Sequence, residues 1–128
     1  MDIPYTIGFD SKRKTAYCKL RGFWDEKTVE AYVVEIRRLV AAWSSQGIKP
    51  EEISVITDTR EMGVQSAELV HRFNELRASQ LFTFRREAIV VESALLRMQV
   101  RRVVDQRLEV LTSDKEAEAW LSRDDTAE

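Results

Sequence analysis

Apolar residues alternate with polar or small ones in two short stretches near the start of the chain. The alternating apolar positions are Tyr5, Ile7, Phe9, Ala16, Cys18 and Leu20. A spacing of two is typical of β-strands that bury one face. We therefore predict an antiparallel hairpin whose connection is the polar stretch 10–15 and whose second strand ends at Gly22.

The next segment has the spacing of a helix, because apolar residues recur every three or four positions. They are Val29, Tyr32, Val33, Ile36, Leu39, Val40 and Trp43. This pattern predicts an amphipathic helix with one wide buried stripe. Asp25 is suited to cap its N-terminus, and Gly47 lies where a helix is expected to end.

Three short apolar runs follow, at residues 53–57, 88–91 and 108–111. They lack a polar residue at every second position, which is typical of strands covered by helices on both faces. Residues 58–65 are predicted to form a loop, and 88–91 to be the most central strand. Helices are expected after Ser66, Ser93 and Ser113, and Glu116 completes a capping box with Ser113.

The element order is therefore β-β-α-β-α-β-α-β-α, which predicts an α/β fold with a mixed five-stranded sheet. Residues 1–123 are expected to form a single layered domain, and residues 124–128 a polar C-terminal tail. Strands two to five should be parallel and joined by right-handed crossovers, with the first strand as an antiparallel edge.

Composition narrows the possible functions. The 128 residues carry a formal net charge of -2, which gives no general reason to expect nucleic acid or an anionic membrane as a partner. No apolar run approaches the ~20 residues that span a bilayer, and the N-terminus does not resemble a signal peptide. A single cysteine excludes an internal disulfide, so a cytoplasmic location is expected.

The order and length of these elements resemble the STAS domain (sulfate transporter and anti-sigma factor antagonist), in particular its bacterial sporulation stage II AA-like members. The resemblance rests on the sequence Leu-Arg-Gly-Phe-Trp-Asp at 20–25, on residues 53–60, and on residues 86–91 running into Ser93. It covers roughly residues 5–121 and implies a sheet with helices on its faces. In antagonist members, phosphorylation of a Ser or Thr at the start of the second helix controls binding to a kinase-like partner.

That phosphorylated residue lies in an Asp-Ser-Ser-Gly type motif, and this chain departs from it. Ser66 stands at the position of the Asp, Ala67 and Glu68 stand at the two Ser positions, and the Gly is absent. The resemblance therefore implies the fold, while the phosphorylation switch is not expected here.

Five residues at the end of the third predicted strand form the candidate binding surface: Asp58, Thr59, Arg60, Gln65 and Ser66. Ligands of parallel α/β sheets gather at the carboxyl ends of strands. Asp58 could contact a partner, or its carboxylate could accept backbone N–H bonds in the loop. Ser66 could be phosphorylated or touch a ligand, or it could serve only as a helix cap.

Other residues with reactive side chains have simpler explanations. His71 falls off the apolar stripe of its helix and is expected in solvent, and Cys18 is expected to be a small buried residue. One His and one Cys cannot build the usual His/Cys metal sites, so no metal or cofactor is predicted. The arginines of residues 85–107 could meet an acidic partner, a phosphate or nucleic acid, but are favoured as a charged outer face that pairs with the acidic C-terminus. They are Arg85, Arg86, Arg97, Arg101, Arg102 and Arg107.

Aromatic residues suggest two further surfaces. Leu81, Phe82 and Phe84 precede a strand without fitting a helix pattern, and they are candidates for an apolar interface. If Trp24 is also exposed, a homodimer is plausible. Tyr32, Trp43 and the phenylalanines could instead line a pocket for a small apolar ligand.

Three functions are compared on these grounds. We favour a non-catalytic interaction module that binds an as yet unidentified protein. The alternative is a carrier or sensor of a small apolar, lipid-like ligand. An enzyme ranks last, because Asp58 and Arg60 are too few residues to define a reaction.

Overall fold

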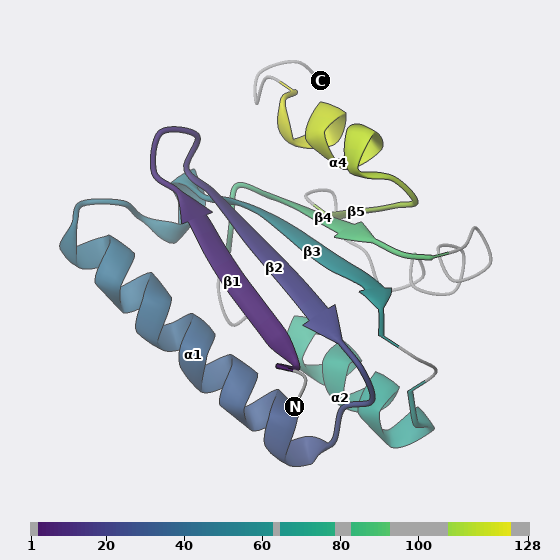
Figure 1. The fold of residues 1–128 in the computed structure, drawn as a ribbon. Coiled ribbons are helices and arrows are strands. Elements are labelled where there is room, and N and C mark those ends of the chain that lie inside the picture. The colour runs from purple at the N-terminus through teal and green to yellow at the C-terminus, as the bar shows by residue number, and fades with distance from the viewer. Residues whose placement is uncertain (1–2, 63–64, 79–82, 93–107, 124–128) are drawn as a thin grey trace.

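Five strands and three α-helices make up the described part of the chain. The computed structural model describes residues 3–62, 65–78, 83–92 and 108–123 (Figure 1). The strands are β1 (Tyr5–Asp10), β2 (Thr15–Arg21), β3 (Ser54–Glu61), β4 (Arg86–Val90) and β5 (Leu108–Leu111). The helices are α1 (Glu26–Ser45), α2 (Ala67–Ala78) and α4 (Asp114–Leu121), with a 3-10 turn, η1 (Pro50–Glu52), before β3. The helix predicted after Ser93 and the tail 124–128 lie outside the described residues.

The strands form one sheet in the order β1-β2-β3-β4-β5. β1 and β2 are antiparallel, and every other neighbouring pair is parallel, as predicted. The prediction that 88–91 is the most central strand is wrong, because β3 lies in the middle. An apolar run indicates that both faces of a strand are covered. It does not indicate how many strands lie on each side of that strand in the sheet.

β3 is longer than its apolar run suggests. Asp58, Thr59, Arg60 and Glu61 were predicted to begin a loop, but they continue the strand, and Arg21 of β2 lies opposite Glu61. The prediction failed because residues 58–61 are polar on both faces of the strand, while the strand still pairs with β2 and, at Asp58, with β4. Side-chain polarity alone does not end a strand whose neighbours continue beside it.

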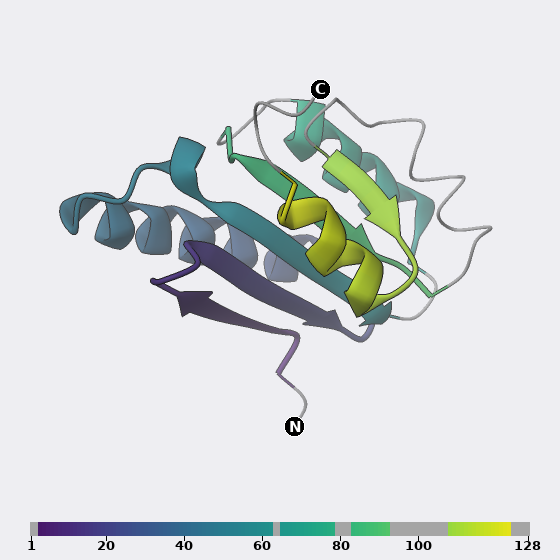
Figure 2. The same cartoon turned by 90° about the horizontal axis from the view of Figure 1, so that it is seen from above.

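The caps of α1 explain its length. The Asp25 carboxylate accepts a hydrogen bond of 2.8 Å from the Thr28 N–H, as predicted for a capping residue. The helix ends before Gly47, whose φ of +87° is a left-handed conformation that glycine adopts without strain. α1 and α2 lie on one face of the sheet, and α4 lies on the other (Figure 2).

An aromatic cluster fills the space between the sheet and the helices α1 and α2. Trp24 is only 1% exposed, and its ring lies 5.3–5.9 Å from those of Tyr5, Tyr32 and Phe73. The expectation that Trp24 is exposed is therefore wrong. Its indole N–H also donates to the Arg21 carbonyl, which satisfies the buried polar atom.

α4 covers only part of its face. Ala117 and Leu121 are buried against Ile56, Ala88 and Val90, and this short helix packs mainly over β4 and β5. Among the described residues, no helix covers β1 and β2 on this side (Figures 1 and 2). We call this uncovered side of β1 and β2 the open face. None of the described helices is long and apolar enough to span a bilayer.

Candidate functional site

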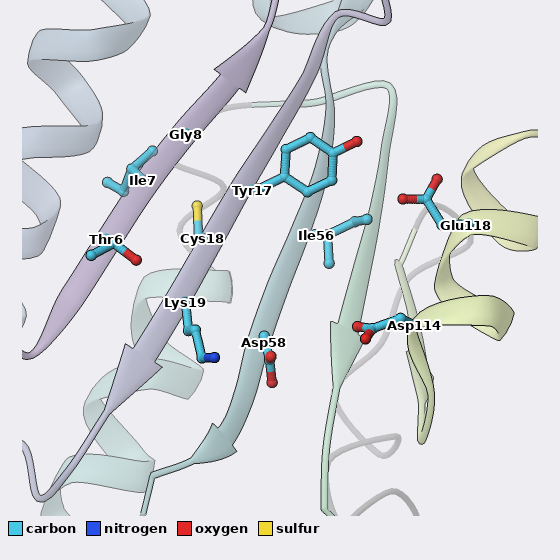
Figure 3. A pocket seen from close by; sticks show the side chains of 10 residues that line it. All are labelled: Thr6, Ile7, Gly8, Tyr17, Cys18, Lys19, Ile56, Asp58, Asp114 and Glu118. Atoms are coloured by element: carbon cyan, nitrogen blue, oxygen red, sulfur yellow. The ribbon is translucent and has the colours of Figure 1, made fainter.

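A groove with a volume of about 540 Å³ lies on the open face, between the hairpin strands and α4 (Figure 3). Its lining residues are Thr6, Ile7, Gly8, Tyr17, Cys18, Lys19, Ile56, Asp58, Asp114 and Glu118. β1, β2 and β3 provide the floor, and the first two turns of α4 provide one wall. The side chains of Ile7 and Cys18 pack on the α1 side of the sheet, so these two residues border the groove through their backbone.

The floor combines small and apolar surface. Gly8 brings no side chain, and a Cβ atom placed there would meet nothing within 4 Å. Tyr17 is half-buried and packs with Ile56 against the cluster beneath α4. This gives a flat apolar floor that remains accessible because α4 does not extend over it.

A charged network joins the floor to the wall. Arg60 forms two hydrogen bonds of 3.0 Å with the Asp58 carboxylate, through Nε to Oδ1 and through Nη2 to Oδ2. Its Nη2 also donates to Asp114 Oδ1 at 2.8 Å, so one guanidinium links β3 to the start of α4. The Asp58 side chain is 16% exposed, compared with 71% for Asp114.

This geometry determines how Asp58 ionises. Burial raises the pKa of the Asp58 carboxyl, but the hydrogen bonds from Arg60 and its positive charge outweigh burial. The pKa of Asp58 consequently lies below its ordinary value. Hydrogen bonds to Asp58 and Asp114 likewise raise the pKa of Arg60. Both groups are charged at neutral pH and fixed in place.

The other charged residues around the groove are also paired. Lys19 pairs with Glu61, and the Arg13 guanidinium donates to Glu118 at 2.7 Å. Arg13 also donates to the Tyr17 hydroxyl at 3.3 Å. The rim therefore presents acids and bases already joined to one another, which suits a partner that brings its own mixed charges.

The Cys18 thiol and the His71 imidazole, which could act as nucleophile or base, both lie outside the groove. Cys18 is buried, and burial raises the pKa of its thiol to about 11, so it is protonated at neutral pH. His71 is exposed on α2, with its Nε2 3.4 Å from Glu75. Both positions agree with the sequence predictions. Among the residues that the structure describes, no group of three His, Cys, Asp or Glu side chains could hold a metal ion.

The structure divides the predicted surface. Asp58 lines the groove, and Arg60 is bonded to it and to Asp114 on the wall. Thr59 instead donates to the Val90 carbonyl at 2.9 Å and so ties β3 to β4. Gln65 accepts from the Trp24 N–H and donates to the Gly22 carbonyl, both at 2.9 Å. Ser66 accepts from the Leu69 N–H at 3.1 Å, as a capping residue does. Thr59 and Gln65 therefore hold separate segments together, and Ser66 caps α2.

The arginines near β4 are not a solvated outer face, and this part of the prediction is wrong. Arg86 is 9% exposed, and its guanidinium stacks on Trp120 at 4.8 Å. Arg85 donates to carbonyls at the end of α4. Each covers apolar surface or satisfies a helix end, which charge counting along the sequence does not reveal. The remaining arginines of the cluster, Arg97, Arg101, Arg102 and Arg107, lie outside the described residues.

Of the predicted apolar interface, only Phe84 is described. Its side chain is half-buried and packs against the cluster beneath α1. Leu81 and Phe82 lie outside the described residues. The structure therefore gives no described surface at this place for a dimer.

Most of the groove was not predicted from the sequence. Thr6, Tyr17 and Lys19 occupy the alternate positions of the hairpin, so the same period that identified the buried face also placed them on the other side. The missing information was that α4 stops short of this face. Asp114 and Glu118 were recognised only as part of a helix, because their contact with β3 and the hairpin is long-range.

Comparison of the sequence with protein-family models and with curated proteins finds no match. Among solved structures, the chain is similar to an uncharacterized protein of the DUF3478 family with a SpoIIAA-like fold from Shewanella loihica PV-4. The TM-score is 0.69 at 20% identity, over 91% of this chain and 93% of the other. This chain has the SpoIIAA-like fold. The α/β class and the resemblance stated from the sequence are thereby confirmed, and at this identity the likeness concerns the fold alone.

Proposed function

We propose that this protein is a non-catalytic interaction module that binds a protein partner in the groove of the open face. The observation that carries the proposal is the asymmetry of the sheet. α1 and α2 cover β1 and β2 on one side, while the other side leaves an apolar floor within a charged rim. An apolar centre surrounded by polar groups is the usual anatomy of a protein interface.

The charged rim indicates what the partner must offer. Asp114 is the most exposed acid of the Arg60 network, and Glu118 lies one turn further along α4. A peptide segment with an aliphatic side chain over Tyr17 and a basic residue beside Asp114 would match both features. Such a segment gains by apolar contact, and its charge gives orientation more than affinity.

A carrier of a small apolar ligand fits the structure less well. Its cavity was expected beneath the aromatic helices, where the rings of Tyr5, Trp24, Tyr32 and Phe73 pack against one another. The groove lies on the opposite face and is open to solvent. Sites for small molecules usually bury most of the ligand.

Partner binding should not depend on phosphorylation at the start of α2. Ala67 and Glu68 replace the two Ser positions of the antagonist motif and offer no hydroxyl. The Ser66 hydroxyl is already engaged with the Leu69 N–H. We therefore propose that the partner binds the groove without any change in the phosphorylation state of the module.

A site-specific photo-crosslinker tests the surface. We would place p-benzoylphenylalanine at Tyr17, on the groove floor, and separately at Val34, which is 64% exposed on α1. The proposal expects discrete protein adducts from Tyr17 and none of the same adducts from Val34. Asp114→Arg, which blocks the rim, should reduce the Tyr17 adducts. Equal adducts from both positions, or none from Tyr17, would refute the proposal.

A further inference from the structure

β1 forms one edge of the sheet, and its outer side has no strand beside it among the described residues. The direction of its backbone groups follows from the register with β2. The Arg21 N–H donates to the Pro4 carbonyl at 2.8 Å, so the hydrogen-bonded pairs are those of Pro4, Thr6, Gly8 and Asp10. The N–H and C=O groups of Tyr5, Ile7 and Phe9 consequently point outward, away from β2.

This edge lacks the features that usually prevent strand pairing. Within its bounds, β1 contains no proline, lysine or arginine, and its register with β2 has no bulge. Its one charged residue is Asp10 at the last position, and the Asp10 carboxylate accepts from the backbone N–H groups of Lys12 and Arg13 in the hairpin turn. Edge strands are normally protected by one of these devices. An unprotected ladder of donors and acceptors is a surface that fits another strand.

The margin along this edge is also apolar. Ile7 and Phe9 on β1 and Ile36 and Leu39 on α1 are only partly buried, because the sheet ends beside them. α1 runs alongside β1 (Figure 1), so the apolar margin extends from the strand to the helix. A partner strand would therefore cover apolar side chains as well as satisfy the backbone.

We propose that the partner strand is β1 of a second copy, paired antiparallel about a two-fold axis at Ile7. Tyr5 then lies opposite Phe9 of the second copy, and Ile7 lies opposite Ile7. On the open face, Thr6 lies opposite Gly8, so the pairing meets no bulky side chain there. A two-fold interface requires a self-complementary surface, and this register provides one without opposing like charges.

The consequence is one continuous sheet across both copies. The grooves of the two open faces lie on the same side of this sheet, and they are separated only by the paired β1 strands. This dimer uses backbone pairing, so it does not depend on Leu81 or Phe82, and it does not depend on the function proposed for the groove.

Disulfide trapping tests both the pairing and its register. Thr6 and Gly8 form a non-hydrogen-bonded pair in the proposed register, with Cα atoms about 4.5 Å apart, within the range of about 4.4–6.8 Å that a disulfide accepts. We would oxidise an equal mixture of Thr6→Cys and Gly8→Cys proteins, both with Cys18→Ala. A Cβ at Gly8 meets nothing within 4 Å, and Thr6 is exposed, so both variants should fold.

The proposal expects mainly the mixed disulfide between the two variants, identified by mass spectrometry. Registers shifted by two residues would join Thr6→Cys to itself or Gly8→Cys to itself, and a predominance of either product overturns the proposal. Val34→Cys in the same background gives the yield from random collision. Sedimentation velocity of the unmodified protein should show a dimer that dissociates on dilution. A monomer at every concentration also overturns the proposal.

Discussion

Arg60 and Asp58 are two residues apart on β3 and meet through both carboxylate oxygens, each at 3.0 Å. Residues at this spacing share one face of a strand, so the sequence places both side chains on the same side of the sheet. The pair is partly shielded from water, because the Asp58 side chain is 16% exposed and that of Arg60 34%. Two polar residues therefore continue a strand whose first half is apolar.

Arg60→Leu should destabilise the protein, because it leaves the half-buried Asp58 carboxylate without its main partner. We expect a loss of about 1–2 kcal/mol, since the pair lies between a surface and a buried ion pair. Urea denaturation at neutral pH measures this loss. Asp114→Asn removes the exposed partner only and should cost less than about 0.5 kcal/mol. Equal losses for the two variants would show that the Asp58–Arg60 pair contributes no more to stability than the Arg60–Asp114 pair.

The lowered pKa of Asp58 gives the stability a defined pH dependence. A carboxyl with a lower pKa in the folded protein contributes its full stabilisation above its unfolded pKa, and loses it as the pH falls through the folded pKa. The difference in unfolding free energy between wild type and Asp58→Asn should therefore be constant near neutrality and shrink below the ordinary value of 3.8.

Carboxyl NMR measures the same effect directly. The Asp58 resonance should titrate with a midpoint below 3.8, and Arg60→Leu should move this midpoint upward. Burial raises the pKa of Asp58 once the guanidinium is gone. An unchanged midpoint in Arg60→Leu would mean that another group lowers the pKa.

The sequence was sufficient for the order of the described strands along the chain and for their relative directions, but not for which strand is central in the sheet. Asp25, Ser66 and Ser113 were also identified correctly as caps, since capping depends on residues three positions apart. Periodicity did not predict the burial of a residue where that burial depends on elements distant in the sequence. Trp24 illustrates this, because the rings that bury it come from β1, α1 and α2.

The candidate site could be predicted only in part for the same reason. Asp58 was singled out because it follows an apolar run, and it does lie in the groove. Its neighbour Thr59 points to the other face, as alternation along a strand requires once β3 is known to continue. The place of Tyr17 and Glu118 in the site could not be predicted, because the two residues are far apart in the sequence. In the fold, Arg13 donates hydrogen bonds to both side chains.

Replacement of Ser66 separates its role as a cap from a role in regulation. Ser66→Ala removes the acceptor for the Leu69 N–H and should destabilise α2 by about 1 kcal/mol. Ser66→Asp keeps an acceptor at the cap and should restore the stability to within a few tenths of a kcal/mol. Thermal unfolding followed by circular dichroism compares the three proteins.

The same variants bear on the proposal that the partner binds without any change in the phosphorylation state of the module. Ser66→Asp also brings a negative charge to the position, yet crosslinking from Tyr17 should remain at the wild-type level. A large change in adduct yield without a change in stability would indicate that the start of α2 does regulate the partner. Ser66→Ala adds no charge at this position and serves as the uncharged control. Its crosslinking is measured at the temperature at which its stability equals that of Ser66→Asp.

Arg85 fastens the end of α4 to the sheet. Its Nη1 donates to Ser54 Oγ at 2.8 Å and to the Leu121 carbonyl at 2.9 Å, and its Nη2 donates to the Arg123 carbonyl at 2.7 Å. The carbonyls at a helix C-terminus lack partners within the helix, and a cation there also meets the negative end of the helix dipole. α4 has only eight residues, so the hydrogen bonds from Arg85 should matter for the whole helix.

Arg85→Met should therefore release α4 before the rest of the protein unfolds. We expect a loss of about 1.5–3 kcal/mol, as for hydrogen bonds to a charged group, and faster amide exchange in Asp114–Leu121 than in β2 or β3. Because Asp114 and Glu118 form the wall of the groove, crosslinking from Tyr17 should fall as well. Arg123→Met removes only an exposed guanidinium over Trp120 and should leave the exchange of α4 and the crosslinking almost unchanged. If Arg85→Met changes neither the adduct yield nor the amide exchange of α4, the other contacts of the helix hold it in place. These include the hydrogen bond from Arg86 to the Trp120 carbonyl and the buried Ala117 and Leu121. The wall of the groove would then not depend on Arg85.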